Sequence, residues 1–322
     1  MKLSFNLKDI TTYRSELMGW SIIWIMMLHF SFIHIKPLGF IAQYGFAGVD
    51  IFMFLSGFGL FYSLDKESQL WPFYRKRLLR IFPTYYILGA FASILLFHDS
   101  FFGYLFRYST IGFWTGSLFW EWYIPSIVVL YLFAPLIKKL IDNNLLSILT
   151  CLTILVLCIS YYIVSHEIVG AKDPHFFFLY RIPAFILGMT SAHWLNKGIS
   201  IKYYFYILIL GIPCFAYLFP QHHEIYNYKY FSLLFLLPFF ILCFIIISRI
   251  LVFLNPIVAQ IGRASLEVYL IQTIFFSAII TGQLTINPIW HDAITLALMI
   301  TSSLFGIFAH WLIDKSGILH LL

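Results

Sequence analysis

Five ionisable side chains lie inside long apolar runs of the sequence: His29, Asp50, Arg181, Glu267 and His310. An ionisable group within a membrane-spanning segment is expensive, so it is by default a candidate functional residue. His29 is suited to base chemistry, because imidazole has an ordinary pKa of about 6.5 and takes a proton from a hydroxyl near neutral pH. The competing interpretation for His29 is an interhelical hydrogen bond with no catalytic role.

Asp50 and Ser56 stand in the segment GFAGVDIFMFLSGFG, whose glycines allow either close helix packing or a break in the helix. Two interpretations stay open. In one, Asp50 and Ser56 line a polar pore. In the other, Asp50 pairs with a buried donor and Ser56 is a small-residue packing contact. Arg181, in FLYRIPAFILGM, either joins such a pore or extends along its own stem to the outer membrane interface.

Two further groups lie near the expected inner ends of helices. Glu267 and Gln272 are five positions apart, so they point to different helix faces and do not form a paired acid and base. A structural role and a pore-lining role both fit Glu267. Arg77 and Arg80, in RKRLLR, are three positions apart and share a helix face, where they fit phosphate binding or an ordinary positive anchor.

The elements that must position these residues are membrane helices. The chain of 322 residues is 61% hydrophobic and 11% charged, with a mean hydropathy of +0.88, which excludes a soluble globular domain. The sequence predicts an all-α, multi-pass membrane helical bundle forming one domain over residues 1–322. Ten spans are expected, at 17–34, 41–64, 81–98, 122–141, 144–165, 175–195, 202–220, 230–248, 264–281 and 290–313.

The basic residues orient this bundle. Most of the 20 Lys and Arg residues fall in segments that are cytoplasmic when the N-terminus is inside, which predicts two cytoplasmic termini. The net charge of +6 then has a membrane explanation, so nucleic acid is not an expected partner. The four cysteines lie in apolar spans, and neither a disulfide nor a metal site is expected. The aromatic segment 98–120 is expected to lie along the outer interface or to enter the bilayer partly.

Four stretches, in this order, resemble acyltransferase family three of integral membrane acyltransferases. They are ELMGWSIIWIMMLHF, GFAGVDIFMFLSGFGLF, FYRKRLLRIFPTYYI and SLEVYLIQTIF, supported by WYIPSIVVLYLFAPLI and YRIPAFILGM. The family includes many O-acetyltransferases of bacterial surface glycans. The resemblance implies a multi-pass enzyme of the cell's inner or plasma membrane. Such an enzyme transfers an acetyl or similar acyl group to a hydroxyl of a cell-surface glycan or lipid-linked sugar. The donor is cytoplasmic acetyl-CoA or another acyl-CoA.

The resemblance also implies roles for single residues. His29 matches the first-helix histidine of the family, and Asp50 with Ser56 matches its second-helix motif. Arg77 and Arg80 match a cytoplasmic two-arginine motif that is thought to meet the phosphates of CoA. In the implied mechanism, His29 takes the proton of the acceptor hydroxyl or carries the acyl group briefly as an acyl-imidazole. Asp50 then orients His29 or balances a nearby arginine.

Two positions depart from the family pattern. The family arginine of the first helix stands where this chain has Met18, and we hypothesise that Arg14, one turn earlier, replaces it. Gln272 stands where many relatives carry histidine. Two other classes therefore stay open: a transporter or flippase that uses a buried His, Asp and Arg relay, and an inactive interaction partner. Arg181 and Glu267 stay candidates for lining the pore, and formation of a homo-oligomer also stays open.

Overall fold

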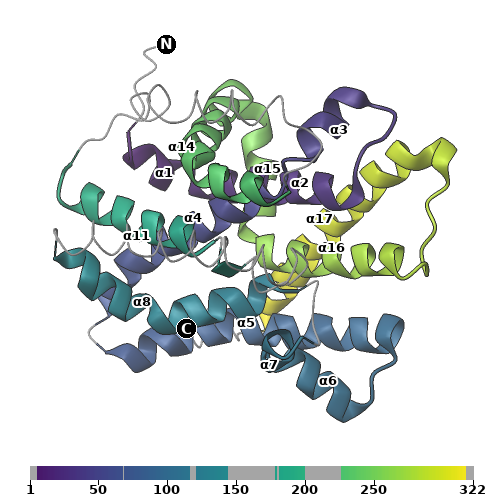
Figure 1. Ribbon diagram of the computed structural model, residues 1–322, viewed down its shortest axis with the longest axis horizontal. Helices are drawn as coiled ribbons and strands as arrows, with labels where there is room; N and C mark the ends of the chain where they lie inside the picture. Colours follow the sequence, from purple (N-terminus) through teal and green to yellow (C-terminus); the bar gives the residue numbers. More distant parts are fainter. Residues whose placement is uncertain are drawn as a thin grey trace. The chain divides into compact units, whose positions relative to one another are not determined.

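The computed structural model describes residues 6–67, 69–116, 121–143, 178–179, 181–199 and 226–316 (Figure 1). These residues form helices joined by short connections, with no strand among them. The all-helical class predicted from the sequence is therefore confirmed for the described part of the chain. The spans expected at 144–165 and 202–220 lie outside the described residues, as do three of the four cysteines.

The chain divides into two compact units, each assembled from three separate stretches of sequence. The unit called here the Asp50 unit combines Met1–Leu17, Val49–Ser68 and Leu132–Pro256. The unit called the His29 unit combines Met18–Gly48, Gln69–Tyr131 and Ile257–Leu322. The candidate residues of the sequence are thus distributed over two separately packed groups of helices.

The His29 unit contains most of the described helices. Its helices α16 and α17 pack along each other, because Gly306 of α17 leaves room for α16: a Cβ added at Gly306 would stand 2.4 Å from the side chain of Val268. In chain order the elements are most of α2 (Arg14–Phe30), α3 (Lys36–Ala42), α5 (Leu70–Ala92), the π-helical turn η1 (Ser93–Phe97), α6 (Phe101–Tyr108), α7 (Ile111–Trp114), the first part of α8 (Tyr123–Asp142), most of α15 (Asn255–Arg263), α16 (Ser265–Ile280), the short turn η4 (Pro288–Trp290) and α17 (His291–Lys315).

The Asp50 unit is centred on two helices that touch at glycines. A Cβ added at Gly57 would lie 2.1 Å from the carbonyl oxygen of Phe185, and one at Gly188 would lie 2.0 Å from that of Phe54. The close helix approach that the glycines predicted is therefore confirmed at Gly57. The elements of this unit are α1 (Lys8–Thr12), α4 (Ala47–Lys66), the end of α8, α11 (Ile182–Asn196), α14 (Tyr226–Ile250) and η3 (Val252–Leu254).

Several described helices are long and apolar enough to cross a membrane. Four meet this criterion singly, and a fifth candidate is a pair of helical segments bent by 92° at a short break. α16 is apolar but shorter. The count of ten spans and the cytoplasmic termini stay predictions. The four helices are Ala47–Lys66, Leu70–Phe97, Tyr123–Asp142 and Pro288–Lys315, and the bent pair is Leu236–Ile250 with Val252–Arg263.

Helix α2 ends earlier than the first span predicted from the sequence. It stops at Phe30, because Ser31 has a φ of +56° in the left-handed region, which a continuing helix does not allow. The carbonyl oxygen of Phe30 accepts a hydrogen bond from Thr295 Oγ1 of α17 at 3.1 Å. His29 therefore lies in the last turn of α2 rather than deep inside a longer helix.

Candidate functional site

His29 is held by two residues of α16, and all three belong to the His29 unit. The ring nitrogen Nδ1 of His29 lies 2.8 Å from Oε1 of Gln272, and the His29 ring stacks on Phe276 with centroids 4.5 Å apart. Because an amide oxygen only accepts hydrogen bonds, Nδ1 carries the proton and Nε2 presents its lone pair. Gln272 is fully buried, whereas His29 is partly exposed. The result is a base with a fixed tautomer and a fixed ring plane.

Gln272 is the functional residue that the sequence analysis undervalued. The sequence indicated only that a histidine of many relatives is replaced here, and it left Asp50 either to orient His29 or to balance a nearby arginine. The structure gives that contact to Gln272, and Phe276 follows it one turn later on the same helix face. The available signal was a buried amide on a helix whose neighbouring positions are nearly all apolar.

A second set of contacts fixes the chain immediately after His29. The carboxylate of Asp292, in the first turn of α17, accepts hydrogen bonds from three consecutive backbone N–H groups, those of Ile33 at 2.9 Å, His34 at 3.1 Å and Ile35 at 2.7 Å. The ring of His34 also meets the carbonyl oxygen of Pro288 at 2.7 Å. The last turn of α2 is therefore fastened to α17, and its position determines where the His29 ring stands.

We expect Asp292→Ala to lower turnover by about ten- to a hundredfold, because a displacement of about 1 Å at a catalytic group is costly. The half-saturating acyl-donor concentration should change much less, since Asp292 acts on the position of His29 alone. Steady-state kinetics on purified protein checks both quantities. Asp314→Asn, at an exposed position of the same helix, is the matched control. Equal loss of turnover in the two variants would contradict a specific role for Asp292.

Asp50 is paired with Arg181 inside the Asp50 unit. Arg181 Nε lies 3.3 Å from Oδ1 of Asp50, and the side chains are 1% and 3% exposed. The alternative in which Arg181 extends outward to the interface is therefore wrong. Ser56 lies on α4 beside the glycine contact described above and is partly exposed. Arg14 begins α2 in the part of that helix that belongs to the Asp50 unit, and its guanidinium lies against Gly59 of α4 in the same unit.

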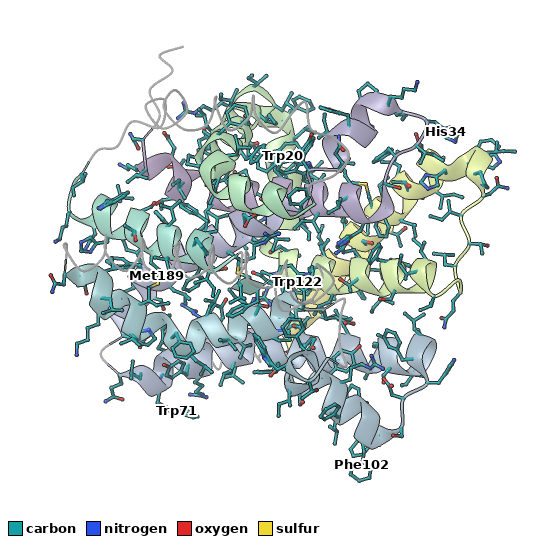
Figure 2. The ribbon with its side chains drawn as sticks, viewed as in Figure 1. Trp20, His34, Trp71, Phe102, Trp122 and Met189 are labelled. Atoms are coloured by element: carbon teal, nitrogen blue, oxygen red, sulfur yellow. The ribbon has the colours of Figure 1, made fainter. Side chains whose placement is uncertain are left out.

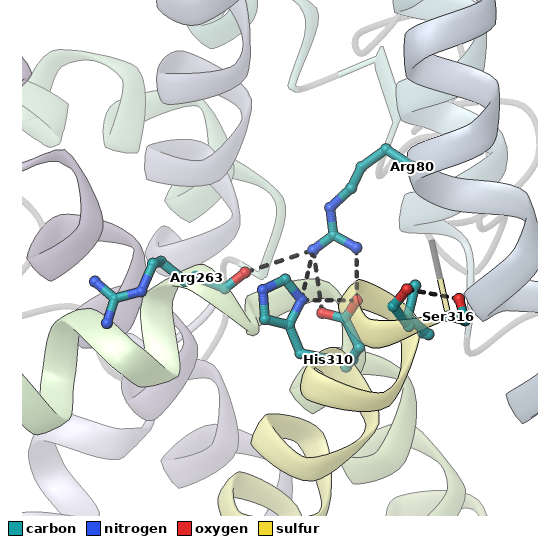
Figure 3. A network of polar contacts seen from close by, with 6 residues as sticks. Arg80, Arg263, His310 and Ser316 are labelled. Atoms are coloured by element: carbon teal, nitrogen blue, oxygen red, sulfur yellow. Dashed lines mark hydrogen bonds and ion pairs between the residues drawn. The ribbon is translucent and has the colours of Figure 1, made fainter. Parts of the chain in front are cut away.

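Glu267 and Arg80 form the centre of a polar network in the His29 unit (Figure 3). Arg80 Nη2 donates to Glu267 Oε2 at 3.2 Å, and Nη1 donates to the other oxygen of the same carboxylate. His310 Nδ1 lies 3.3 Å from Glu267 Oε1. Arg80 also reaches the carbonyl oxygen of Arg263 at 3.4 Å. Glu267 is fully buried, so Arg80 balances a charge that would otherwise be unpaired.

Arg77 differs from Arg80 in its surroundings. Both lie on α5, three positions apart as the sequence predicted, but Arg77 stacks its guanidinium over the Phe73 ring at 5.5 Å. Among the described residues, Arg77 makes no ion pair, and its Nε has no hydrogen-bond partner. Of the two arginines, Arg77 is thus the one whose charge a phosphate would find without displacing a carboxylate.

This difference predicts separate outcomes for the two arginines. We expect Arg77→Ala to raise the half-saturating acyl-CoA concentration about tenfold with little loss of stability, because it removes one charged contact to phosphate. Arg80→Ala should instead destabilise the protein by about 2 kcal/mol, because it removes a charged partner of Glu267. Thermal unfolding and steady-state kinetics of both variants check this. Equal effects of the two substitutions on stability would contradict it.

The predicted outer segment forms a compact aromatic hairpin in the His29 unit. Arg107 of α6 binds Asp99 through Nε at 2.8 Å and Nη2 at 3.0 Å, and holds the pKa of the Asp99 carboxyl below its ordinary value of 3.8. Phe101 and Phe102 are 69% and 80% exposed, and Figure 2 shows Phe102 projecting outward. These exposed rings fit the interfacial position predicted from the sequence.

Behind this hairpin lies a buried carboxyl that the sequence analysis did not identify. Glu121 is 4% exposed and precedes α8, and burial raises the pKa of its carboxyl to about 7 from an ordinary 4.5. Arg107, Asp99 and Tyr108 are the charged and titratable groups that act on it most strongly. An acid at this position is therefore protonated in the folded protein over a pH range in which the unfolded chain has lost the proton.

The raised pKa of Glu121 predicts a pH-dependent stability. Between pH 4.5 and about pH 7 the folded state binds the extra proton, so the free energy of unfolding falls as pH rises through this window. The total loss should approach about 3 kcal/mol, and Glu121→Gln should remove it. Unfolding in detergent at a series of pH values, with wild type and variant compared, measures the difference. Parallel curves for the two proteins would contradict the prediction.

The chain is similar in sequence to known acyltransferases. A family model described as an acyltransferase domain matches residues 17–311. The chain belongs to this acyltransferase family. Its family is the one that the resemblance of the motifs implied, and the family together with the long apolar helices indicates a membrane protein.

One curated relative supports the same activity. The protein of Acidianus two-tailed virus named "Putative acetyltransferase ORF330" is 32% identical over 191 residues, which cover 54% of this chain and 53% of the relative. The chain thus spans about half the length of the curated relative it matches. No solved structure matches the chain.

Proposed function

We propose that this acyltransferase moves an acetyl group, or a similar acyl group, from cytoplasmic acyl-CoA to a hydroxyl of a cell-surface glycan or lipid-linked sugar. It would act as a multi-pass protein of the cell's inner or plasma membrane. The observation that carries the proposal is the hydrogen bond from His29 Nδ1 to Gln272, which leaves Nε2 as the accepting atom. Acyl transfer to a hydroxyl needs one such base at the point of attack.

The proposed step uses His29 as base and then as acid. His29 Nε2 removes the proton of the acceptor hydroxyl while the hydroxyl oxygen attacks the thioester carbonyl carbon. The carbon–sulfur bond breaks, the new ester carries the acyl group, and the CoA thiolate takes the proton back from Nε2. The developing positive charge on the ring is spread toward Gln272 Oε1, which accepts from Nδ1 throughout. No metal is required by this step.

The remaining candidate residues have supporting roles in the proposal. Arg77 binds the phosphates of CoA, with Arg80 beside it held by Glu267. Asp50 and Arg181 form a buried ion pair that stabilises the Asp50 unit. These contacts give Asp50 and Glu267 partners within the protein, so neither needs a substrate to balance its charge.

The experiment that tests the proposed function is consumption of the donor. Purified protein in detergent or nanodiscs is mixed with acetyl-CoA labelled in the acetyl group and with an extract of cell-envelope glycan. The proposal predicts free CoA and label on the glycan. A transporter or flippase, which a buried His, Asp and Arg relay would also suit, moves its substrate without cleaving the thioester. Intact acetyl-CoA after incubation with active, folded protein would overturn the proposal.

A further inference from the structure

A cluster of polar side chains in the His29 unit has unused hydrogen-bonding capacity. Tyr108 Oη lies 3.5 Å from Glu121 Oε1, the outer limit of a hydrogen bond, and Glu121 Oε2 has no hydrogen-bond partner among the described residues. Tyr85 Oη is also without a partner there, and the rings of Tyr85 and Tyr108 meet at 5.1 Å. All three side chains are less than 5% exposed. Such groups are costly to bury unless a partner arrives.

The cluster is held firmly from several sides. The ring of Tyr108 packs against Gly89 so closely that a Cβ there would lie 2.4 Å from a ring carbon. Tyr104 Oη donates to the carbonyl oxygen of Tyr86 at 2.9 Å, which ties α6 to α5. The orientation of Tyr108 and Tyr85 toward Glu121 is therefore a property of the packed hairpin and not of loose side chains.

The same cluster borders the helix face that holds His29. Tyr269 of α16 interacts electrostatically with Glu121, and its ring contacts Tyr123 at 5.5 Å. Gln272 and Phe276, the two residues that contact His29, follow Tyr269 by three and seven positions, so the three share one face of α16. The cluster of Glu121 and Tyr85 thus neighbours the helix whose side chains hold His29.

We propose that Glu121 and Tyr85 bind hydroxyl groups of the sugar acceptor. This inference rests on the proposed function and names two residues that would hold its acceptor. A carboxyl oxygen accepts from a sugar hydroxyl, and a tyrosine hydroxyl both donates and accepts. The surrounding tyrosine rings supply apolar surface for the carbon–hydrogen faces of a sugar ring. A simple alcohol offers one hydroxyl for His29 and none for this cluster.

The test compares two variants at the cluster with a control on the same hairpin. Glu121→Gln and Tyr85→Phe are assayed for transfer of labelled acetyl groups to the cell-envelope glycan extract, and separately to 1-octanol as a single-hydroxyl acceptor. Tyr104→Phe is the control, because its hydroxyl already has a backbone partner. Thermal unfolding normalises each assay to folded protein. We expect the half-saturating glycan concentration to rise about ten- to a hundredfold in the two cluster variants and to stay unchanged in the control.

The outcomes separate this inference from the proposed function. Unchanged half-saturation by acetyl-CoA and by 1-octanol, with weakened saturation by glycan, supports a sugar site at Glu121 and Tyr85. Wild-type transfer to glycan with unchanged half-saturation in both cluster variants overturns the inference and leaves the proposed function standing. Equal weakening with 1-octanol also overturns it, because the cluster would then act on His29 and not on sugar hydroxyls. Absence of any donor cleavage by wild type overturns the proposed function and the sugar site with it.

Discussion

Replacing His29 with alanine is expected to lower acyl transfer by about a hundred- to ten-thousandfold, the usual range for loss of a general base. The half-saturating acyl-CoA concentration should stay close to that of wild type, because the arginines proposed to bind CoA are untouched. His29→Gln should be equally impaired, since an amide does not accept a proton under these conditions. Steady-state release of free CoA, measured at matched amounts of folded protein, checks the prediction.

A second histidine variant controls for a general effect of replacing a histidine. His98→Asn changes an exposed histidine in the same unit, and its φ of +52° is one that asparagine tolerates. We expect His98→Asn to transfer acyl groups at the wild-type rate. A folded His29→Ala protein with wild-type turnover would remove His29 from the mechanism.

The second large effect is expected at the buried ion pair of the Asp50 unit. Asp50→Ala removes the carboxylate that lies 3.3 Å from the buried guanidinium of Arg181, and breaking such a pair typically costs about 3–5 kcal/mol. Replacing both residues by apolar side chains of similar size should restore most of that loss, because the cost lies in the uncompensated charge. Denaturant titration in detergent of wild type, both single variants and Asp50→Leu with Arg181→Met measures this.

The same series of variants decides what Asp50 does. If the pair is structural, the double variant regains both stability and acyl transfer. A double variant that folds with wild-type stability and yet transfers no acyl group would show that Asp50 or Arg181 takes part in the chemistry. A single Asp50→Ala variant as stable as wild type would contradict the burial of this pair.

The class of structure followed from composition, while the contacts of the site did not. Long apolar runs force helices, because a backbone in hydrocarbon must satisfy its own hydrogen bonds. The family motifs likewise pointed to His29, Arg77 and Arg80. The partner of His29, however, lies 243 positions away at Gln272, and local patterns in a single sequence do not reveal which distant helix faces meet.

The predictions from the sequence differ from the structure where contacts between distant segments override a local sequence pattern. α2 was expected to run to residue 34, but it ends at Phe30. Thr295 donates a hydrogen bond to the Phe30 carbonyl oxygen, and Asp292 accepts hydrogen bonds from the backbone that follows. Arg80 was grouped with Arg77 by spacing and by the family motif, although only Arg80 reaches the carboxylate of Glu267. Glu121 went unnoticed, because its position beside Trp122 gives no sign that Tyr85 and Tyr108 surround it.

The central claim is that His29 presents an unprotonated Nε2 because Gln272 fixes the proton on Nδ1. The most direct measurement is nitrogen NMR of protein labelled at histidine side chains, with the His29 signals assigned by comparison with His29→Gln. We expect a neutral His29 ring at pH 7.5 with the proton on Nδ1, and a mixture of tautomers once Gln272 is replaced by leucine. A His29 ring protonated on Nε2 in the wild-type protein, or a tautomer indifferent to Gln272→Leu, would contradict it.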